Sequence, residues 1–391
     1  MTHYLDYNAT APYADSVLQW LKSEELPYAN PASTHSAGRI SRQLIQKTSR
    51  FLLDSFQLEK THDIFYHSGA SEGINTIFKA LAQHATLDRG KFAHFFYSPI
   101  DHACVIEVVS ELSGQGHKSS SFSLNPEGEW DQKSFWSQWD EQGEKLAGAL
   151  PVVNWTYAHN ETGVLWLLED LRIFKEKWGA FLHVDAVQTL GRVATPTALP
   201  PEIDAYSFSG HKFGALKGIG FSFIRKDFPF RPLIAGGGQQ KGRRSGTENP
   251  LGVYSLYLAL NELKEKFNPQ ELKMAKEWLE VSLENYFGPK VKIMCKGAKN
   301  RNLNTISLLF REHRSDVIQA ACDLKNIYVS MGSACSSGSS KPSKVLEHLQ
   351  VDKNCLSNLI RLSFSPYLNR DKAQVIYKDL TTALAPFVNN M

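Results

Sequence analysis

Apolar runs of β-forming residues alternate with helix-like segments through the first half of the chain, and this alternation constrains the fold most strongly. Strand-like runs lie at 64–68, 92–97, 146–155, 181–185 and 205–209. Strands that alternate with helices usually pair in parallel, with helices on both faces of the sheet. We therefore predict an α/β fold with a large domain built on a mainly parallel mixed sheet flanked by helices.

The second part of the chain has a different texture. A Gly-rich, basic loop at 234–249 is followed by long helices and then by a mixture of short strands and helices. We place a domain boundary in the helix after this loop, which gives a large domain over 15–257. The remaining segments, 1–14 and 258–391, are expected to form a smaller α+β domain, with the N-terminal residues lying as an arm on the body.

Composition narrows the class of protein. The 391 residues are 42% hydrophobic and 21% charged, which is ordinary for a globular protein. A net charge of +3 with interspersed signs argues against a nucleic-acid or membrane-binding face. We find no apolar run long enough to span a bilayer and no N-terminal signal peptide, so we expect a cytoplasmic protein.

Two strand ends carry the most informative side chains. The run 205–209 leads into Gly210-His-Lys212, and the run 181–185 ends in Asp185. A lysine and an acid placed in this way suit pyridoxal 5'-phosphate (PLP), because the acid keeps the pyridine nitrogen protonated and the lysine holds the aldehyde. Taken alone, Asp185 also suits a cap or turn, and Lys212 also suits a solvent-exposed loop.

Further groups fall at the same end of the predicted sheet. The turn 68–73 joins a strand to a helix start, where free N–H groups can bind an anion. Asn160 and Ser209 also fall at the ends of strand-like runs. Ligands of open α/β sheets bind outside the carboxyl ends of the strands. The sequence therefore predicts one site that collects these residues with Asp185 and Lys212.

The five cysteines are odd in number, scattered and without a CxxC pair, so neither a disulfide framework nor a structural metal site is indicated. Cys335 differs from the others because it lies among small polar residues in 333–342 that cannot bury it well. An exposed thiol in such a loop is a candidate nucleophile.

Together with these features, a series of ordered motifs resembles the cysteine desulfurases of the class V aminotransferase group, which share the fold type I architecture of PLP enzymes. The resemblance runs essentially end to end. Its motifs are Tyr4–Pro12, Asn30–His35, Ser68–Glu72, Asp101–Ala103, Asn160–Gly163, His183–Gln188, Ser209–Lys212, Gly236–Asn249, Gly332–Cys335 and Ile360–Ser363.

The resemblance implies a role for each matching residue. Lys212 would form the Schiff base with PLP, Asp185 would hold the pyridine nitrogen, and His102 would stack on the ring. Gln188 and Asn160 would face the ring hydroxyl. The residues implied to bind the phosphate are Ala70, Ser71, Ser209, His211 and, from a neighbouring subunit of a homodimer, Thr247.

The same resemblance implies the substrate and the reaction. Arg361 would grip the carboxylate of L-cysteine, which suits its planar fork, and Asn8 and Asn30 would support binding. Lys212 would move the Cα proton and Cys335 would take the sulfur as a persulfide, leaving L-alanine. The sulfur would then pass to an acceptor protein, either an iron–sulfur scaffold or a tRNA-thiolation protein. No metal, nucleic acid or membrane is implied.

Some positions depart from the usual motifs. Asp101 stands where Glu is usual, His159 stands for Asn, and Gln240-Lys241 stands for Glu-Arg. None of these removes a residue with an assigned role. Selenocysteine lyase remains an alternative within the fold, an aminotransferase would have no use for the Cys335 loop, and a non-catalytic sulfur-relay subunit is the alternative from another class.

Overall fold

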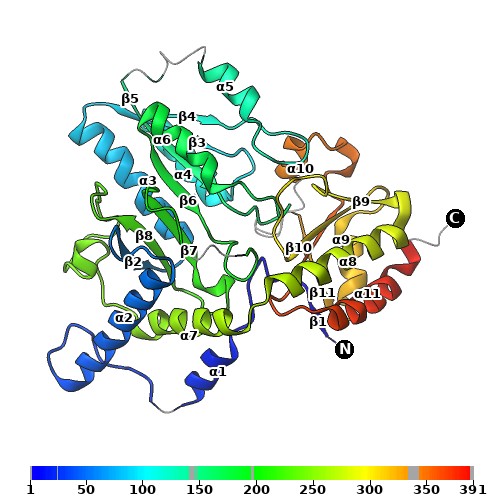
Figure 1. Cartoon of the computed structure of the whole chain (residues 1–391), viewed down its shortest axis with the longest axis horizontal. Coiled ribbons are helices and arrows are strands. Elements are labelled where there is room, and N and C mark those ends of the chain that lie inside the picture. The colour runs from blue at the N-terminus through cyan, green and yellow to red at the C-terminus, as the bar shows by residue number, and fades with distance from the viewer. Residues whose placement is uncertain are drawn as a thin grey trace.

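The structure, a computed structural model of the chain, contains a seven-stranded sheet, a four-stranded antiparallel sheet and a two-stranded parallel sheet (Figure 1). The residues that it describes are 2–23, 25–140, 146, 148–194, 198–332 and 343–387. The larger sheet and the helices around it form one body, which the smaller sheet and its helices adjoin.

The seven-stranded sheet has the order β2-β8-β7-β6-β5-β3-β4. Only β8 runs antiparallel to its neighbours, so the predicted mainly parallel mixed sheet is confirmed. Its strands are β2 (His62–His67), β3 (Phe92–Tyr97), β4 (Lys118–Ser121), β5 (Ala149–Thr156), β6 (Phe181–Asp185), β7 (Ala205–Ser209) and β8 (Gly220–Arg225).

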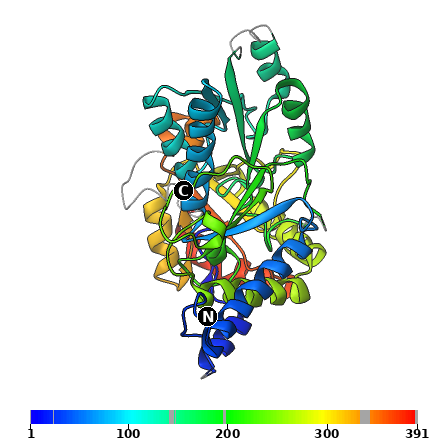
Figure 2. The same cartoon turned by 90° about the vertical axis from the view of Figure 1, so that its left-hand side faces the viewer.

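Helices cover both faces of this sheet, as Figure 2 shows. One face packs against α3 (Ala70–Gln83) and α4 (Ala103–Gly114) through an aliphatic and aromatic core. The other face packs in a larger, aromatic-rich core, which also includes residues of α10 (Lys344–His348). The helices on this face are α1 (Asp15–Lys22), α2 (Ser36–Ser55), α5 (Gln132–Asp140), α6 (Arg172–Trp178) and α7 (Pro250–Lys266). The sequence did not predict α5, whose apolar residues are interrupted by polar ones.

The smaller sheet has the order β12-β13-β10-β9 and its own apolar core. Leu5 of the N-terminal arm belongs to this core, and β1 pairs with β11 beside it. The elements are β1 (His3–Tyr4), α8 (Pro269–Phe287), β9 (Val291–Ile293), β10 (Thr305–Phe310), α9 (Ser315–Asp323), β11 (Ile327–Tyr328), β12 (Ser330–Met331), α10 (Lys344–His348), β13 (Leu359–Ser363) and α11 (Arg370–Leu384). The division at 257/258 stays a prediction.

Local signals fix where the long helices begin. Asn249, Asn268 and Asn369 precede α7, α8 and α11, and the side chain of each accepts a hydrogen bond from a backbone N–H of the first turn. Proline opens both α7 and α8, where the missing N–H costs nothing. Both signals, the Asn caps and the proline starts, are visible in the sequence.

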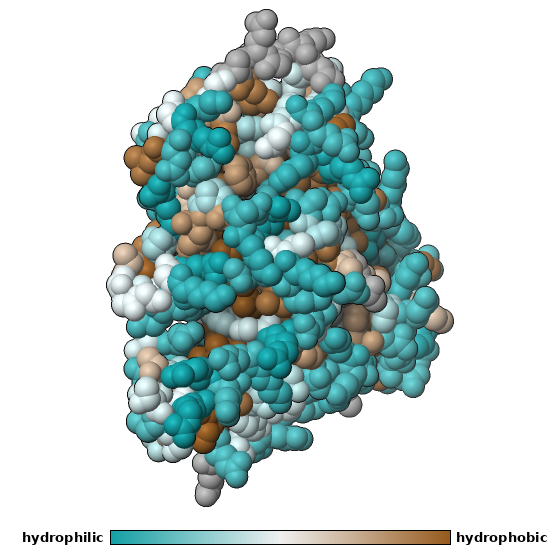
Figure 3. Space-filling model, turned by 60° about the vertical axis from the view of Figure 1, so that its left-hand side comes forward, coloured by the Kyte–Doolittle hydropathy of each residue, from teal (hydrophilic) through white to brown (hydrophobic). Residues whose placement is uncertain are grey.

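The surface shown in Figure 3 is mostly hydrophilic, with apolar side chains in small separate groups. Within the part of the chain that the structure describes, no helix combines the length and the apolar character needed to cross a bilayer.

Candidate functional site

The carboxyl ends of five strands converge on one cleft. Strands β3, β5, β6 and β7 are parallel, and β2 runs the same way because β8 lies antiparallel between it and β7. The segments that follow these strands enclose a cavity of about 560 Å³. The predicted residues that line it are Asn8, Ala70, Ser71, His102, Asn160, Asp185, Gln188, Ser209, His211, Lys212 and Arg361.

Lys212 enters the cleft from the single turn Gly210–Lys212 that follows β7. Its Nζ donates hydrogen bonds to the backbone oxygens of Asn8 at 2.7 Å and Ala9 at 2.9 Å. The N-terminal arm therefore holds the amine in place inside the cleft. The arm is itself held, because Arg192 donates to the backbone oxygens of both Tyr7 and Lys212.

Asp185 closes β6 and is buried, with 7% of its surface exposed. Burial raises the pKa of this carboxyl above its usual value, and a hydrogen bond from the Val187 N–H together with the nearby His102 and Lys212 only partly offsets this. A buried acid without a close ion pair is stabilised as the carboxylate when a cationic group lies beside it. The geometry can therefore hold a protonated ring nitrogen.

His102 lies on the loop between β3 and α4 and caps that helix. Its Nδ1 accepts a hydrogen bond from the backbone N–H of Cys104 and lies 3.0 Å from the Cys104 sulfur. Because Nδ1 acts as the acceptor, the neutral imidazole carries its proton on Nε2. The ring is thus fixed at the cleft with a defined tautomer.

Gln188 offers a free acceptor. Its Nε2 donates to the backbone oxygen of Asn8 at 2.9 Å, whereas its buried Oε1 has no hydrogen-bond partner among the described residues. Buried amide oxygens are rarely left unpaired, since the desolvation is costly. The unpaired Oε1 therefore fits a hydroxyl-bearing ligand in the cleft.

An anion cradle lies at the start of α3. The helix begins at Ala70, directly after Gly69, so its first N–H groups are free to bind an anion. Ser209 and His211 line the cleft with Ala70 and Ser71. Burial, and then the charge of Lys212, lowers the pKa of His211 to about 4, so this ring is neutral at pH 7 and acts as a hydrogen-bonding group.

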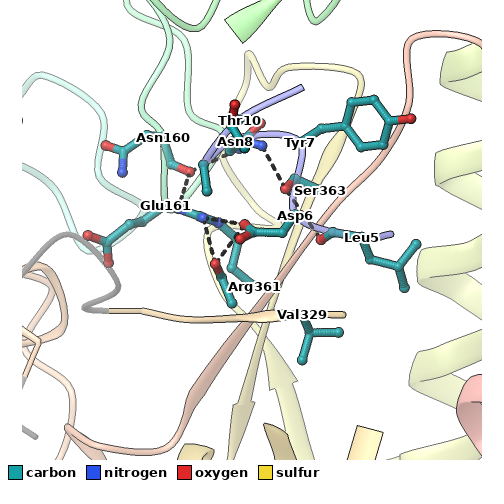
Figure 4. A network of polar contacts seen from close by, with 12 residues as sticks. Leu5, Asp6, Tyr7, Asn8, Thr10, Asn160, Glu161, Val329, Arg361 and Ser363 are labelled. Atoms are coloured by element: carbon teal, nitrogen blue, oxygen red, sulfur yellow. Dashed lines mark hydrogen bonds and ion pairs between the residues drawn. The ribbon is translucent and has the colours of Figure 1, made fainter. Parts of the chain in front are cut away.

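Arg361 on β13 brings the smaller sheet to the cleft, and Figure 4 shows its contacts. Only 2% of its surface is exposed. Its Nη2 donates to Asp6 at 2.9 Å and to Ser330 at 3.0 Å, and its Nη1 donates to the backbone oxygen of Asn160 at 3.3 Å. Asn8 connects the same regions through its Nδ2, which donates to that Asn160 oxygen at 3.0 Å.

Three predicted residues are not among those brought together. Thr247 and Asn30 are exposed and do not line the cleft of this single chain. Cys335 lies in 333–342, outside the described residues. The roles of all three stay predictions.

Other residues of the site were missed by the sequence reasoning. Asp6 and Ser330 hold Arg361, and Cys104 lines the cleft beside His102. Asp101 was noted only as a departure from a motif, yet it accepts hydrogen bonds from Asn154 and Thr156 beneath the cleft. Asp6 lies within the Tyr4–Pro12 motif but had no assigned role, and no local signal connects it or Ser330 with Arg361, which is distant in the chain.

Within the described part of the chain, no cluster of three or more His, Cys, Asp or Glu side chains is placed to hold a metal ion. Sites of this kind need several such ligands at short range.

The chain is similar to proteins already known. A family model described as aminotransferase class-V matches residues 3–376. Cysteine desulfurase 2 of Trichormus variabilis is 32% identical, covering 99% of this chain and 96% of that protein. A cysteine desulfurase of Bradyrhizobium diazoefficiens is 30% identical, covering 93% of this chain and 89% of that protein.

The chain is also similar to solved structures over nearly its whole length. A NifS-like protein superposes with a TM-score of 0.83 at 31% identity, covering 98% of this chain and all of the other. A NifS-like protein from Rickettsia africae superposes with a TM-score of 0.81 at 27% identity, covering 98% of this chain and 100% of that one.

Proposed function

The chain belongs to the aminotransferase class-V family, whose members depend on PLP, and on this premise we propose that it is a cysteine desulfurase. The reaction is the conversion of L-cysteine to L-alanine with transfer of the sulfur to Cys335. Curated relatives at about 30% identity over nearly the full chain carry this name, which supports the proposal.

The residues in the cleft fit PLP. Asp185 offers a buried carboxylate for a protonated ring nitrogen, the free Oε1 of Gln188 offers an acceptor for a ring hydroxyl, and Asn160 lies nearby. The N-terminus of α3, with Ser71, Ser209 and His211, offers donors for a phosphate. When bound, PLP supplies a sink for the electron pair left at the substrate Cα.

Lys212 and His102 are proposed to handle protons. Lys212 lies in the cleft with its amine held by two backbone oxygens, where it can take the Cα proton and return one later. His102 has its Nδ1 engaged with the Cys104 N–H, so Nε2 is the atom that can give or take a proton on the cleft side. Arg361 is proposed to orient the substrate through its carboxylate.

Cys335 is proposed as the sulfur acceptor. Its thiolate attacks the substrate sulfur, the bond between sulfur and Cβ breaks, and the new S–S bond leaves a persulfide on Cys335 and, after protonation, alanine. We further propose a cytoplasmic homodimer in which Thr247 reaches the neighbouring phosphate site and Asn30 supports the substrate. The persulfide would deliver sulfur to an iron–sulfur scaffold or a tRNA-thiolation protein.

One observation carries the proposal: Lys212, Asp185, His102 and Arg361 lie around a single cleft although they come from separate elements of both sheets. A binding protein would need neither a lysine amine at the centre nor a fixed imidazole tautomer. An isolated phosphate-binding site would need only the start of α3.

The test is alanine formation from L-cysteine by the purified protein with PLP and a thiol reductant. We expect alanine from the wild type and from Cys355→Ser, since Cys355 is half-buried and does not line the cleft. We expect PLP binding but no alanine from Cys335→Ser. Alanine formed at the wild-type rate by Cys335→Ser would show that the assigned nucleophile is wrong.

A further inference from the structure

In the proposed function, Arg361 faces the substrate carboxylate. Its side chain is held by Asp6 and Ser330, to which the family resemblance gave no role. Asp6 comes from the N-terminal arm and contacts Arg361 (Figure 4). Ser330 comes from β12 and accepts a hydrogen bond from the same Arg361 nitrogen. We propose that Asp6, supported by Ser330, is a positioning residue that determines how Arg361 recognises a carboxylate. This inference rests on the proposed function.

Backbone pairing places the three groups together. Ser330 lies directly opposite Arg361 in the pairing of β12 with β13. Asp6 forms a bridge with Ser363, two residues further along β13. Neighbouring strands lie about 4.8 Å apart, so these side chains meet without any special loop. The arrangement therefore belongs to the folded sheet itself.

The hydrogen bonds of this cluster have a defined direction. The Ser330 hydroxyl donates to Asp6 Oδ1 at 2.6 Å, so its oxygen accepts from Arg361 Nη2 at 3.0 Å. Asp6 Oδ1 accepts the second Nη2 hydrogen at 2.9 Å. Both hydrogens of Nη2 are thus used, by residues that are not among those lining the cleft.

The rest of the guanidinium is restricted as well. Nε is buried and has no partner among the described residues, so a ligand in the cleft does not reach it without a rearrangement. Nη1 donates one hydrogen, at 3.3 Å, to the backbone oxygen of Asn160, which lines the cleft. Asp6 and Ser330 together form a clamp on Arg361. This clamp leaves Nη1 as the nitrogen that a substrate carboxylate meets.

The clamp also compensates charge. Arg361 is almost fully buried, and Asp6 is its one carboxylate partner among the described residues. A buried cation without a partner is strongly unfavourable, so removal of Asp6 leaves the guanidinium free to turn towards other acceptors. Carboxylate recognition should then weaken, although the thiol and amine of the substrate would bind as before.

The experiment compares Asp6→Ala, Asp6→Asn and Ser330→Ala with the wild-type holoenzyme. We expect Asp6→Ala to raise the KM for L-cysteine and the inhibition constant of L-alanine by about tenfold, the size of one lost charge-assisted hydrogen bond. Asp6→Asn keeps an acceptor without the charge and should give about a threefold rise, with Ser330→Ala no larger. We expect kcat to change much less than KM.

Cysteamine, which lacks the carboxylate, is the matched ligand. Its inhibition constant should be unchanged in all three variants if Asp6 acts through Arg361. Equal weakening of cysteamine and alanine would instead mean that Asp6 supports the whole cleft, and the proposal would be wrong. If Asp6→Ala fails to fold, Asp6→Asn and Ser330→Ala still decide between these outcomes.

Failure of the proposed function would look different. A wild type that forms no alanine would refute desulfuration. The clamp would then be tested by calorimetric binding of L-alanine against ethylamine to the same variants. A loss confined to L-alanine would support the clamp, and equal affinities in wild type and variants would overturn it.

Discussion

The two sides of the cleft are built in different ways. On the sheet side, Asp185 and Ser209 end two neighbouring parallel strands and Lys212 lies in the turn after the second, so each is placed by local structure within one part of the chain. On the arm side, Asp6 and Arg361 are 355 positions apart and meet only when the N-terminal arm crosses the smaller sheet. The comparison shows that one side follows from local structure and the other from tertiary assembly.

The chemistry assigned to the two sides differs in the same way. The sheet side carries the groups for PLP and for proton transfer, and the arm side carries the groups for the substrate carboxylate. Substitutions on the sheet side should therefore lower kcat, whereas those on the arm side should mainly raise KM. A variant that mixes the two effects would break this division.

The largest effect is expected for Lys212→Ala. Loss of the amine removes the group that moves the Cα proton, so alanine formation should fall by about 10³-fold. Lys217→Ala is the matched control, because Lys217 also lines the cleft but is exposed. Steady-state rates and the visible absorption of bound PLP measure both variants. An active Lys212→Ala protein would remove the central residue of the sheet side.

Arg361→Ala should have the next largest effect, on the arm side. It removes the cation for the substrate carboxylate and also leaves Asp6 without its partner, so the KM for L-cysteine should rise by about 10²-fold. Arg361→Lys keeps the charge without the fork and should recover only part of this. Arg314→Ala is the control, because it removes an arginine from an exposed ion pair with Asp316.

The sequence predicted the sheet side well for a physical reason. Strands that are buried on both faces have nearly continuous apolar sequences. The polar residue that ends such a sequence marks the edge of the sheet. Asp185 and Lys212 could be placed in this way before any resemblance was used. The strand in the predicted run at 146–155 begins later, at Ala149, because Gly148 has a φ of 82°, which lies outside the extended conformation of a strand.

The arm side could not be predicted in the same way. Arg361 was assigned only by resemblance, and Asp6 and Ser330 were not assigned at all. Strand β12 has two residues and β9 has three, too short to give an alternating pattern. Contacts between the N-terminal arm, β12 and β13 depend on the register in which these segments pair. A single sequence does not specify that register.

Asn8 connects the two sides and should give a smaller, mixed effect. It is 1% exposed; its Nδ2 donates to the Asn160 oxygen and to Thr305, and its Oδ1 accepts from Arg192. Asn8→Ala removes these buried hydrogen bonds and leaves Arg192 Nε without its acceptor, so the free energy of unfolding should fall by about 3 kcal/mol. Chemical denaturation measures this, with the exposed Asn354→Ala as control. An unchanged stability would mean that water replaces the lost bonds.

Asp101 should give the smallest effect, and it tests the sheet side without touching turnover directly. Burial raises the pKa of Asp101 to about 7, and Asp185 adds to this, although Thr156, Asn154 and the Ser98 N–H donate to the carboxylate. In the unfolded chain the pKa of an aspartate is about 3.9. Between these values the folded protein binds a proton that the unfolded chain has lost.

Stability must therefore fall as the pH rises through this window, since the unfolded state binds fewer protons than the folded state. Between pH 5.5 and pH 7 the Asp101 contribution to the free energy of unfolding should decrease by about 2 kcal/mol. Asp101→Asn removes this titration. Between pH 5.5 and pH 7, the free energy of unfolding of the variant should therefore rise by about 2 kcal/mol relative to that of the wild type, even if the substitution also shifts stability equally at every pH. Asp54→Asn, a substitution at an exposed aspartate, is the control for the change of residue type. Parallel curves for wild type and Asp101→Asn would mean that the three donors keep Asp101 ionised, and that the sheet edge beneath the cleft is more polar than its burial suggests.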